Sequence, residues 1–303
     1  MLILMKKITR LVFTLIFLFI GGPAFAQSWR EIKSDHFLLY FIPSSVIINS
    51  NDSSSEVEAE DFGKEVLRKA EVYYQRIAED LGYQRSSDFW TWDKRAKIYI
   101  YPDHAAFVKA SNHPEWAGGM ADYNTKTIMS FFGSQEFTDA VLPHEIAHLI
   151  FRDFVGFKGE IPLWLDEGVA EWTEVKKRQE IKKMVKEILL KDGLLTMDDM
   201  MKLPIASMKA GDNVYIRPTR TRSGEKGVLF LTGNNLVTLY YVQAVSLVGF
   251  LIEKFGRNDF TGFCRALRDG KNLEEGLIAV YGTHIRNLND FDDQWKKYIE
   301  EES

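Results

Sequence analysis

The segment that most constrains this chain is the pentapeptide His-Glu-Ile-Ala-His at residues 144–148. Two histidines four residues apart lie on one face of a helix, where both imidazoles can bind a single metal ion. Glu145 follows the first histidine and can reach a water molecule on that ion, so it is the expected general base. The flanking residues are uncharged, which favours a buried helix. The pattern therefore predicts a core helix with two metal ligands, His144 and His148, and a base.

A catalytic site of this kind needs a third protein ligand and one open position. The segment at residues 162–172 reads PLWLDEGVAEW, and its Glu167 follows His148 by nineteen residues. That spacing allows the first helix to end near Asp153, a loop to follow, and a second helix to present Glu167. Two imidazoles and a carboxylate form a normal ligand set for Zn²⁺. We therefore expect His144, His148 and Glu167 to bind zinc.

Two alternatives concern residues next to the ligands. Asp166 is the rival third ligand, but it points about 100° away from Glu167 around a helix. We interpret it as a cap or a surface residue. Pro143 precedes the first ligand, so it kinks a helix that begins near Ser134 and costs little in one that begins near Asp139. The ligand spacing is the same in both cases.

Together the two segments resemble the gluzincin peptidases, specifically the peptidase MA-like group, whose pattern is H-E-x-x-H followed by P-x-W-L-x-E-G-x-A-E. The second pattern is matched at Pro162, Trp164, Leu165, Glu167, Gly168, Ala170 and Glu171. The resemblance covers residues 96–190 well and the tail from Tyr241 loosely. It implies that the two histidines and Glu167 are zinc ligands and that Glu145 is the catalytic base or acid. Glu171, one turn beyond Glu167, is expected to accept an imidazole N–H and so to set its tautomer.

The resemblance also indicates where a substrate binds. Zincins hold an extended peptide against an edge strand, and small residues precede the metal-binding helix here at a suitable distance. The residues expected to bind the substrate backbone are Gly118, Gly119, Met120 and Ala121. A plain strand or bulge that contains glycine explains them equally well. The exopeptidase branch carries a glutamate in this strand, and none lies between Trp116 and Phe132, which favours an endopeptidase.

A second group at the developing oxyanion assists zinc hydrolysis. The peptidase MA-like group often has Tyr-x-Gln and a small residue at the start of a helix, and residues 241–244 read YVQA. Tyr241 is therefore the candidate catalytic donor, and Tyr240 is the neighbour that could replace it. A tyrosine with a purely structural role is an equal alternative.

The first 26 residues have the features of a secretory signal peptide. Lys6, Lys7 and Arg10 are followed by an apolar run, and Ala24-Phe25-Ala26 is a small-x-small cleavage site. We expect cleavage before Gln27 and an exported protein, either periplasmic or secreted. No later segment is expected to be long and apolar enough for a second span.

Composition excludes several other classes. The net charge of −5 gives no electrostatic reason to expect a nucleic-acid partner. Cys264 is the only cysteine, which excludes an internal disulfide and thiol catalysis and predicts a small core residue.

The expected fold class is α+β and zincin-like, with a mixed or antiparallel sheet, an active-site helix and a helical C-terminal half. Residues 27–133 are predicted to form an N-terminal α/β sub-domain with the substrate edge strand, and residues 134–303 a helical sub-domain with the zinc site. Within the latter, glycines and prolines at 204–237 predict a loop or a β-hairpin insertion. The expected strands lie in residues 29–42, 96–101, 116–122 and 127–132. The expected helices span residues 56–81, 103–110, 163–176, 178–190, 197–202, 240–255, 259–267, 273–280 and 291–301.

These patterns predict an exported zinc metallopeptidase that acts on a peptide or protein substrate. Two other functions are compatible with the same residues. One is an exported zincin-fold binding or scaffold protein with little turnover. The other is a zinc hydrolase that acts on a non-peptide amide, because the core chemistry is shared.

Overall fold

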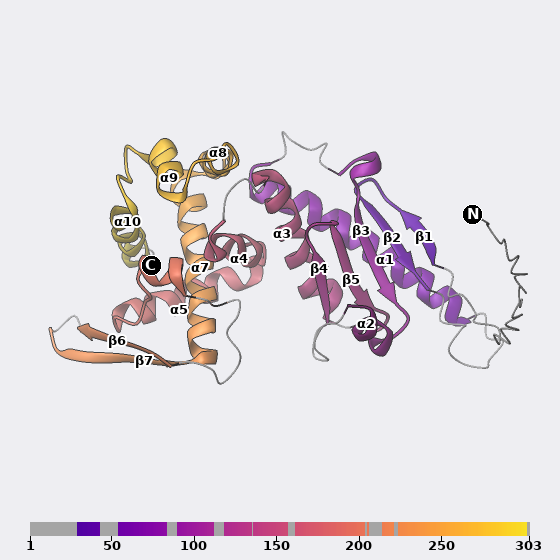
Figure 1. Ribbon diagram of the computed structural model, residues 1–303, viewed down its shortest axis with the longest axis horizontal. Coiled ribbons are helices and arrows are strands. Elements are labelled where there is room, and N and C mark those ends of the chain that lie inside the picture. Colours follow the sequence, from indigo (N-terminus) through magenta and orange to yellow (C-terminus); the bar gives the residue numbers. More distant parts are fainter. Residues whose placement is uncertain are drawn as a thin grey trace, which may run out of the picture.

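The computed structural model describes residues 29–42, 54–83, 90–111, 118–134, 136–156, 161–203, 205, 214–220 and 224–301. A half that contains a sheet is followed by a helical half, and the two lie side by side (Figure 1). This is the α+β class that was predicted, and the sheet is mixed. The predicted signal peptide, Trp116 and Ala117 lie outside the described residues. The zincin-like geometry and the boundaries of the two sub-domains stay predictions.

The N-terminal half is built on a five-stranded sheet. Its strands are β1 (Arg30–Lys33), β2 (Phe37–Phe41), β3 (Ala96–Tyr101), β4 (Gly119–Asp122) and β5 (Thr127–Phe131). The order is β1-β2-β3-β5-β4, in which β2, β3 and β5 are parallel and the two outer strands are antiparallel to their neighbours. The order places β4, which overlaps the predicted substrate strand, at an edge of the sheet.

Alternation of buried residues determines which face of the sheet is covered. Phe37, Leu39 and Phe41 of β2 are buried, as are every second residue of β3. The long helix α1 (Ser54–Asp80) lies against this face and carries its own buried stripe, which includes Val66, Ala70 and Ile77. The alternate buried residues of the strands and the buried stripe of the helix therefore pack together in one core. The short helix α2 (His104–Ser111) packs near the end of β5.

Helix α3 (Leu142–Val155) packs against α1 and carries the HEIAH pentapeptide. A π-helical turn over Phe137–Val141 leads into it, and the N–H of Leu142 donates to the carbonyl of Phe137. Pro143 lies in the first turn of α3, where a missing N–H costs little, so the second alternative for this residue describes the structure. The helix extends past Asp153 and ends at Gly156, whose φ of 69° is left-handed.

The C-terminal half is helical around α7 (Gly233–Phe255), a core helix of 23 residues. The other helices are α4 (Leu163–Trp172), α5 (Arg178–Leu190), α6 (Met197–Lys202), α8 (Arg257–Arg268), α9 (Leu273–Tyr281) and α10 (Leu288–Glu301). Short 3-10 turns cover Trp92–Lys94 and Val175–Lys177. Within the segment predicted as a loop or hairpin, β6 (Val214–Arg220) and β7 (Lys226–Thr232) form an antiparallel hairpin.

Two expectations about α7 are wrong. The helix begins at Gly233 and not near Tyr240, because Leu236 and Leu239 of the extra turns are buried in the core and stabilise them. By length and composition α7 could also cross a membrane. Since 67% of its most apolar stretch is buried inside the molecule, the helix is explained by its place in the core.

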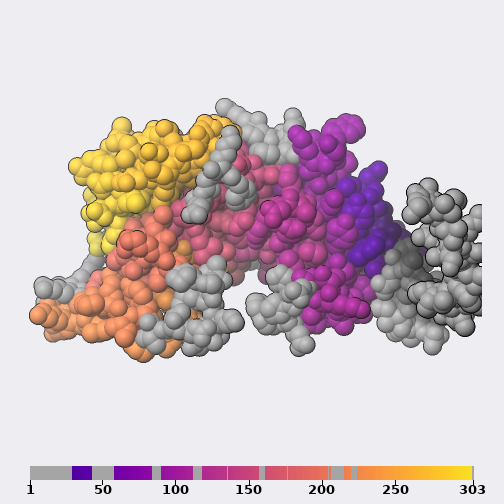
Figure 2. All heavy atoms as spheres, viewed as in Figure 1, coloured from indigo at the N-terminus to yellow at the C-terminus, as the bar shows by residue number. Residues whose placement is uncertain are grey.

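Polar contacts join the two halves away from the ligands. Asp80 at the end of α1 accepts hydrogen bonds from Arg178 of α5 and Arg257 of α8, both at 2.9 Å. Cys264 is buried, as expected for a small core residue, and the Tyr83 hydroxyl donates to its sulfur at 3.2 Å. Figure 2 shows the atoms of the two halves in contact across the middle of the molecule. These contacts hold α3 and α4 in a defined mutual position.

Candidate metal centre

The two histidines of the pentapeptide lie one turn apart on α3 and converge. Their Nε2 atoms are 3.1 Å apart. Apolar residues on the opposite side of the helix, among them Ile146, Leu149 and Ile150, are buried in the core. Burial of that side fixes the rotation of α3, so both rings face α4 across the boundary between the halves.

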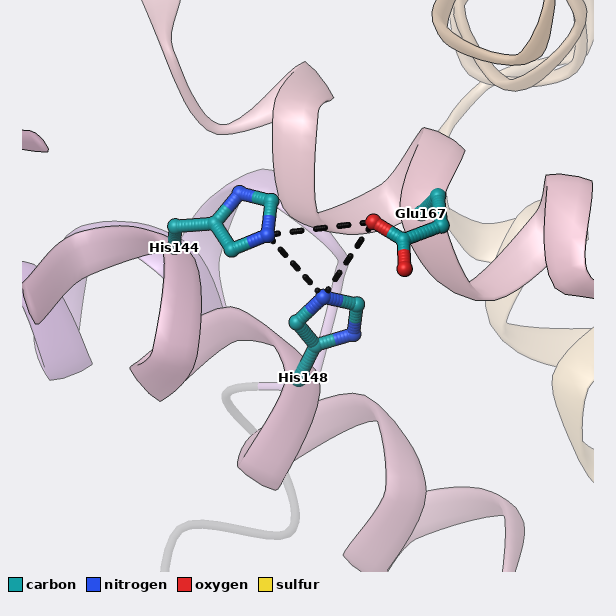
Figure 3. Close-up of side chains that lie close together, drawn as sticks. All are labelled: His144, His148 and Glu167. Carbon is teal, nitrogen blue, oxygen red and sulfur yellow. Dashed lines mark hydrogen bonds and ion pairs between the residues drawn. The ribbon is translucent and has the colours of Figure 1, made fainter. Parts of the chain in front are cut away.

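Glu167 on α4 completes a group of three possible ligands. Its Oε2 lies 3.8 Å from His144 Nε2 and 3.6 Å from His148 Nε2. Figure 3 shows the two rings and the carboxylate pointing toward a common centre. Donor atoms around a tetrahedral Zn²⁺ lie roughly 3.3–3.5 Å apart, given bonds of about 2.0–2.2 Å. The three observed separations bracket that range, so the residues present fit such an ion.

The position of α4 is set by close packing against α7. At Gly168, which follows the third ligand, an added Cβ would lie 2.5 Å from the carbonyl oxygen of Ala244. A side chain at this point would push the helices apart. The glycine therefore brings Glu167 to within reach of the histidines.

Asp166 is not a cap or a surface residue, contrary to expectation. It is buried, and its Oδ1 lies 3.0 Å from His148 Nδ1. Arg152 of α3 also donates to both of its oxygens. An ionised carboxylate only accepts, so His148 donates from Nδ1 and directs the lone pair of Nε2 at the ion position. Asp166 thus sets the tautomer of one ligand, which is the role that was predicted for Glu171.

Glu171 faces the other histidine at a longer distance. Its Oε1 is 3.7 Å from His144 Nδ1, which is beyond hydrogen-bond range. Burial, followed by the charge of neighbouring Glu174, raises the pKa of Glu171. Glu171 therefore does not form the predicted hydrogen bond with an imidazole N–H in this structure. The same three residues, His144, Glu171 and Glu174, form a second group of possible metal ligands that shares this histidine.

The two imidazoles differ in their titration. Burial and, to a smaller extent, the neighbouring His148 together lower the pKa of His144 to about 4. Burial alone would also lower the pKa of His148, but its hydrogen bond to Asp166 and the negative charges of Asp166 and Glu167 outweigh burial and raise the pKa to about 10. The two shifts thus favour a neutral His144 and a protonated, positively charged His148 beside Glu167. A divalent metal ion bound between the three residues can replace this positive charge and displace the proton from His148.

Tyr123 is a site residue that the sequence analysis missed. It follows directly after β4, and its hydroxyl donates to Glu145 Oε2 at 3.3 Å. The guanidinium of Arg152 lies 3.8 Å from the centre of its ring, and His148 contacts the same ring. Burial raises the pKa of the Glu145 carboxyl, which is the direction that suits a general base. No local pattern marks Tyr123, because its partners come from α3.

The four residues predicted to bind substrate are half-buried at the β4 edge. The carbonyl of Gly118 accepts hydrogen bonds from Ser130 and Ser134. A Cβ on Gly119 would lie 3.0 Å from Val141 Cγ1 and 3.1 Å from the carbonyl oxygen of Met129. The close packing of β4 against the turn before α3 therefore explains Gly119 without a substrate. Met120 and Ala121 pair with β5.

The two neighbouring tyrosines on α7 have different roles. Tyr240 is buried, and its hydroxyl donates to the carbonyl of Met200 at 3.0 Å, so it is a structural residue. Gln243 is also structural, since its side chain bonds both the N–H and the carbonyl of Leu195. Tyr241 is half-buried, and burial together with the charges of Glu167 and Glu171 raises its pKa. It lines a pocket together with Glu171, whereas Tyr240 does not.

Residues 226–301 match the sequence profile of the Peptidase MA superfamily. The matched segment includes β7 and α7–α10, and it lies outside α3 and α4, which carry the candidate ligands. No curated protein matches the chain. The match indicates a metallopeptidase-like function, and the superfamily is generally metal-dependent. The matched segment includes α7, against which α4 packs. The profile match and the candidate ligands therefore lie in adjoining parts of the fold.

Proposed function

We propose that the protein is an exported, zinc-dependent endopeptidase. The observation that carries this proposal is the convergence of His144, His148 and Glu167 from two helices, with Glu145 beside them. Two nitrogens, one oxygen and an open position are the ligand set of zinc hydrolases. The likeness to the Peptidase MA superfamily supports the class of reaction. Export rests on the signal-peptide features of residues 1–26.

The chemistry follows from the positions of the side chains. Zinc bound by the three ligands would supply a Lewis acid that makes water nucleophilic near neutral pH. Glu145 takes a proton from the attacking water and gives it to the nitrogen of the leaving amine. Tyr123 orients the carboxylate through its hydroxyl. Tyr241 remains protonated at neutral pH, because its pKa is raised, and it donates a hydrogen bond to the developing oxyanion.

Substrate binding is assigned to the β4 edge. An extended peptide can pair with the outer side of an edge strand, and β4 presents that side next to α3, with Gly118 held at its start by Ser130 and Ser134. The absence of a glutamate from the described strand residues, Gly119–Asp122, favours cleavage within a chain over cleavage at an amino terminus. The expected products are therefore two peptides from a substrate with blocked ends.

The test compares wild type, Glu145→Gln and the exposed control Glu136→Gln. Each is analysed for bound metal and incubated with a library of end-blocked peptides. All three should bind one zinc ion per chain, and Glu145→Gln alone should lose cleavage, by roughly 100-fold or more. Wild-type activity in Glu145→Gln, or absence of metal from the wild type, would overturn the proposal. Bound zinc without cleavage by wild type would favour the binding protein, and cleavage of simple amides alone the non-peptide hydrolase.

A further inference from the structure

A groove leads away from the metal centre between α5 and α7. Glu171 and Tyr241 line its near segment, which has a volume of about 450 Å³. The far segment has a volume of about 320 Å³ and shares Met184, Thr238 and Val242 with the near one. The two segments therefore form one continuous depression, which we term the α5–α7 groove. It begins at Glu171, whose carboxylate faces His144.

The chemistry of the groove is apolar along its length. Helix α5 contributes Ile181 and Ile188, and the hairpin contributes Leu229 and Leu231 at the far end. Beyond Glu171, the charged residues of its lining are exposed; they are Lys177, Glu180 and Lys191. Continuous apolar surface open to water is unfavourable and marks a binding site when it adjoins a functional centre.

The dimensions of the groove indicate the form of its ligand. Along α7 the stretch that leads away from Glu171 and Tyr241 ends at Asn235, six residues or roughly 9 Å from Tyr241 at about 1.5 Å per residue, and Val245 extends the lining by one turn in the other direction. In an extended peptide, side chains on one face recur every second residue, roughly 6.8 Å apart. This length is thus sufficient for two such side chains, and a single side chain would occupy only part of it.

We propose that the α5–α7 groove binds two large apolar side chains at alternate positions of the substrate, on one side of the scissile bond. The substrates are peptides with leucine, isoleucine, methionine, valine or phenylalanine at two positions separated by one residue. This inference rests on the proposed peptidase function and names its substrate class. Continuity between the groove and Glu171, which faces His144, is the argument for a substrate as the occupant.

The first arm of the test uses a matched pair of variants on α7. Thr238 is exposed and lies where the two segments meet, so Thr238→Trp fills the groove with little disturbance of the core. Asn234 is exposed on the same helix and is not part of the lining, so Asn234→Trp is the control.

For wild type, cleavage of a random peptide library should select apolar residues at two positions with one residue between them. Thr238→Trp should lose the selection at the farther position and raise KM for peptides with both residues by roughly 10-fold or more. Asn234→Trp should retain the wild-type pattern. A wild type that cleaves without apolar selection, or a Thr238→Trp selection that equals wild type, would contradict the groove while leaving the peptidase proposal intact.

The second arm needs no turnover. The methyl signal of Met184, identified by its loss in Met184→Leu, is followed by NMR in zinc-loaded Glu145→Gln protein. A peptide with two leucines at alternate positions should shift it, and the same peptide with two serines should not. If wild type cleaves no peptide but the leucine peptide shifts Met184, binding of apolar side chains by the groove stands and the peptidase function fails. An unshifted signal with both peptides would overturn the inference.

Discussion

The two halves of the molecule hold their parts of the candidate metal centre in different ways. In the sheet-containing half, both histidines and Glu145 lie on one helix, so their mutual spacing follows from helix geometry alone. In the helical half, Glu167 and Asp166 lie on α4, whose distance from α3 depends on packing against α7. The spacing of the histidines and Glu145 is therefore a local property of one helix, whereas the position of Glu167 and Asp166 depends on tertiary packing.

This difference teaches where the site can be weakened without touching a ligand. A change within α3 leaves the histidine pair in register as long as the helix forms. A change at the α4–α7 contact moves Glu167 and Asp166 together, because they are neighbours on one helix.

The largest effect is expected from removing a ligand of either half. His148→Ala and Glu167→Ala each leave two of the three protein ligands, so each should abolish stoichiometric zinc binding. The measurement is metal content after gel filtration, with a zinc titration of the apo-protein. His104→Ala, on α2, is the control and should bind zinc as the wild type does. If either ligand variant retained full affinity, the two-helix centre would be wrong.

The next effect separates the two carboxylates that accompany the histidines. Asp166→Asn replaces a group that bonds His148 and Arg152 and should lower zinc affinity roughly 10–100-fold. Glu171→Gln, whose oxygen is 3.7 Å from His144, should lower it less than about 10-fold. Competition with a chelator of known affinity measures both. The reverse ranking would restore the role that the sequence analysis gave to Glu171.

The smallest effect tests the packing that positions α4. Gly168→Ala places a Cβ against the backbone of α7 and should destabilise the protein by about 1–3 kcal/mol. Gly262→Ala, in α8, meets only Val280 at 3.8 Å and should stabilise it by about 0.5–1 kcal/mol.

Denaturant unfolding followed by circular dichroism gives both free energies. A zinc titration of Gly168→Ala should also show weaker binding, because Glu167 moves with α4. Equal stability of the two alanine variants would mean that α4 tolerates displacement from α7. The claim that this packing positions Glu167 would then be wrong.

Much of the fold was predictable because its patterns are local. The strands at 96–101 and 127–131 and the helices at 178–190 and 197–202 follow from burial patterns and turn residues that lie within each segment. The early start of α7 was missed because Gly233, Asn234 and Asn235 are typical of a loop, while the core contacts of Leu236 and Leu239 override that preference. Burial of the rest of α7 also explains why an apolar helix of this length belongs to the core.

The sequence by itself determined which residues carry the chemistry, since the spacing of two histidines on a helix and the composition of the second segment are properties of the chain alone. Only the tertiary structure decided which carboxylate meets which imidazole. Asp166 lies about 100° from Glu167 around α4, and the way α4 packs on α3 turns that side toward His148 and Arg152. The same packing brings Tyr123 to Glu145. Contacts between elements depend on how those elements pack, and the periodicity of a single helix does not contain that information.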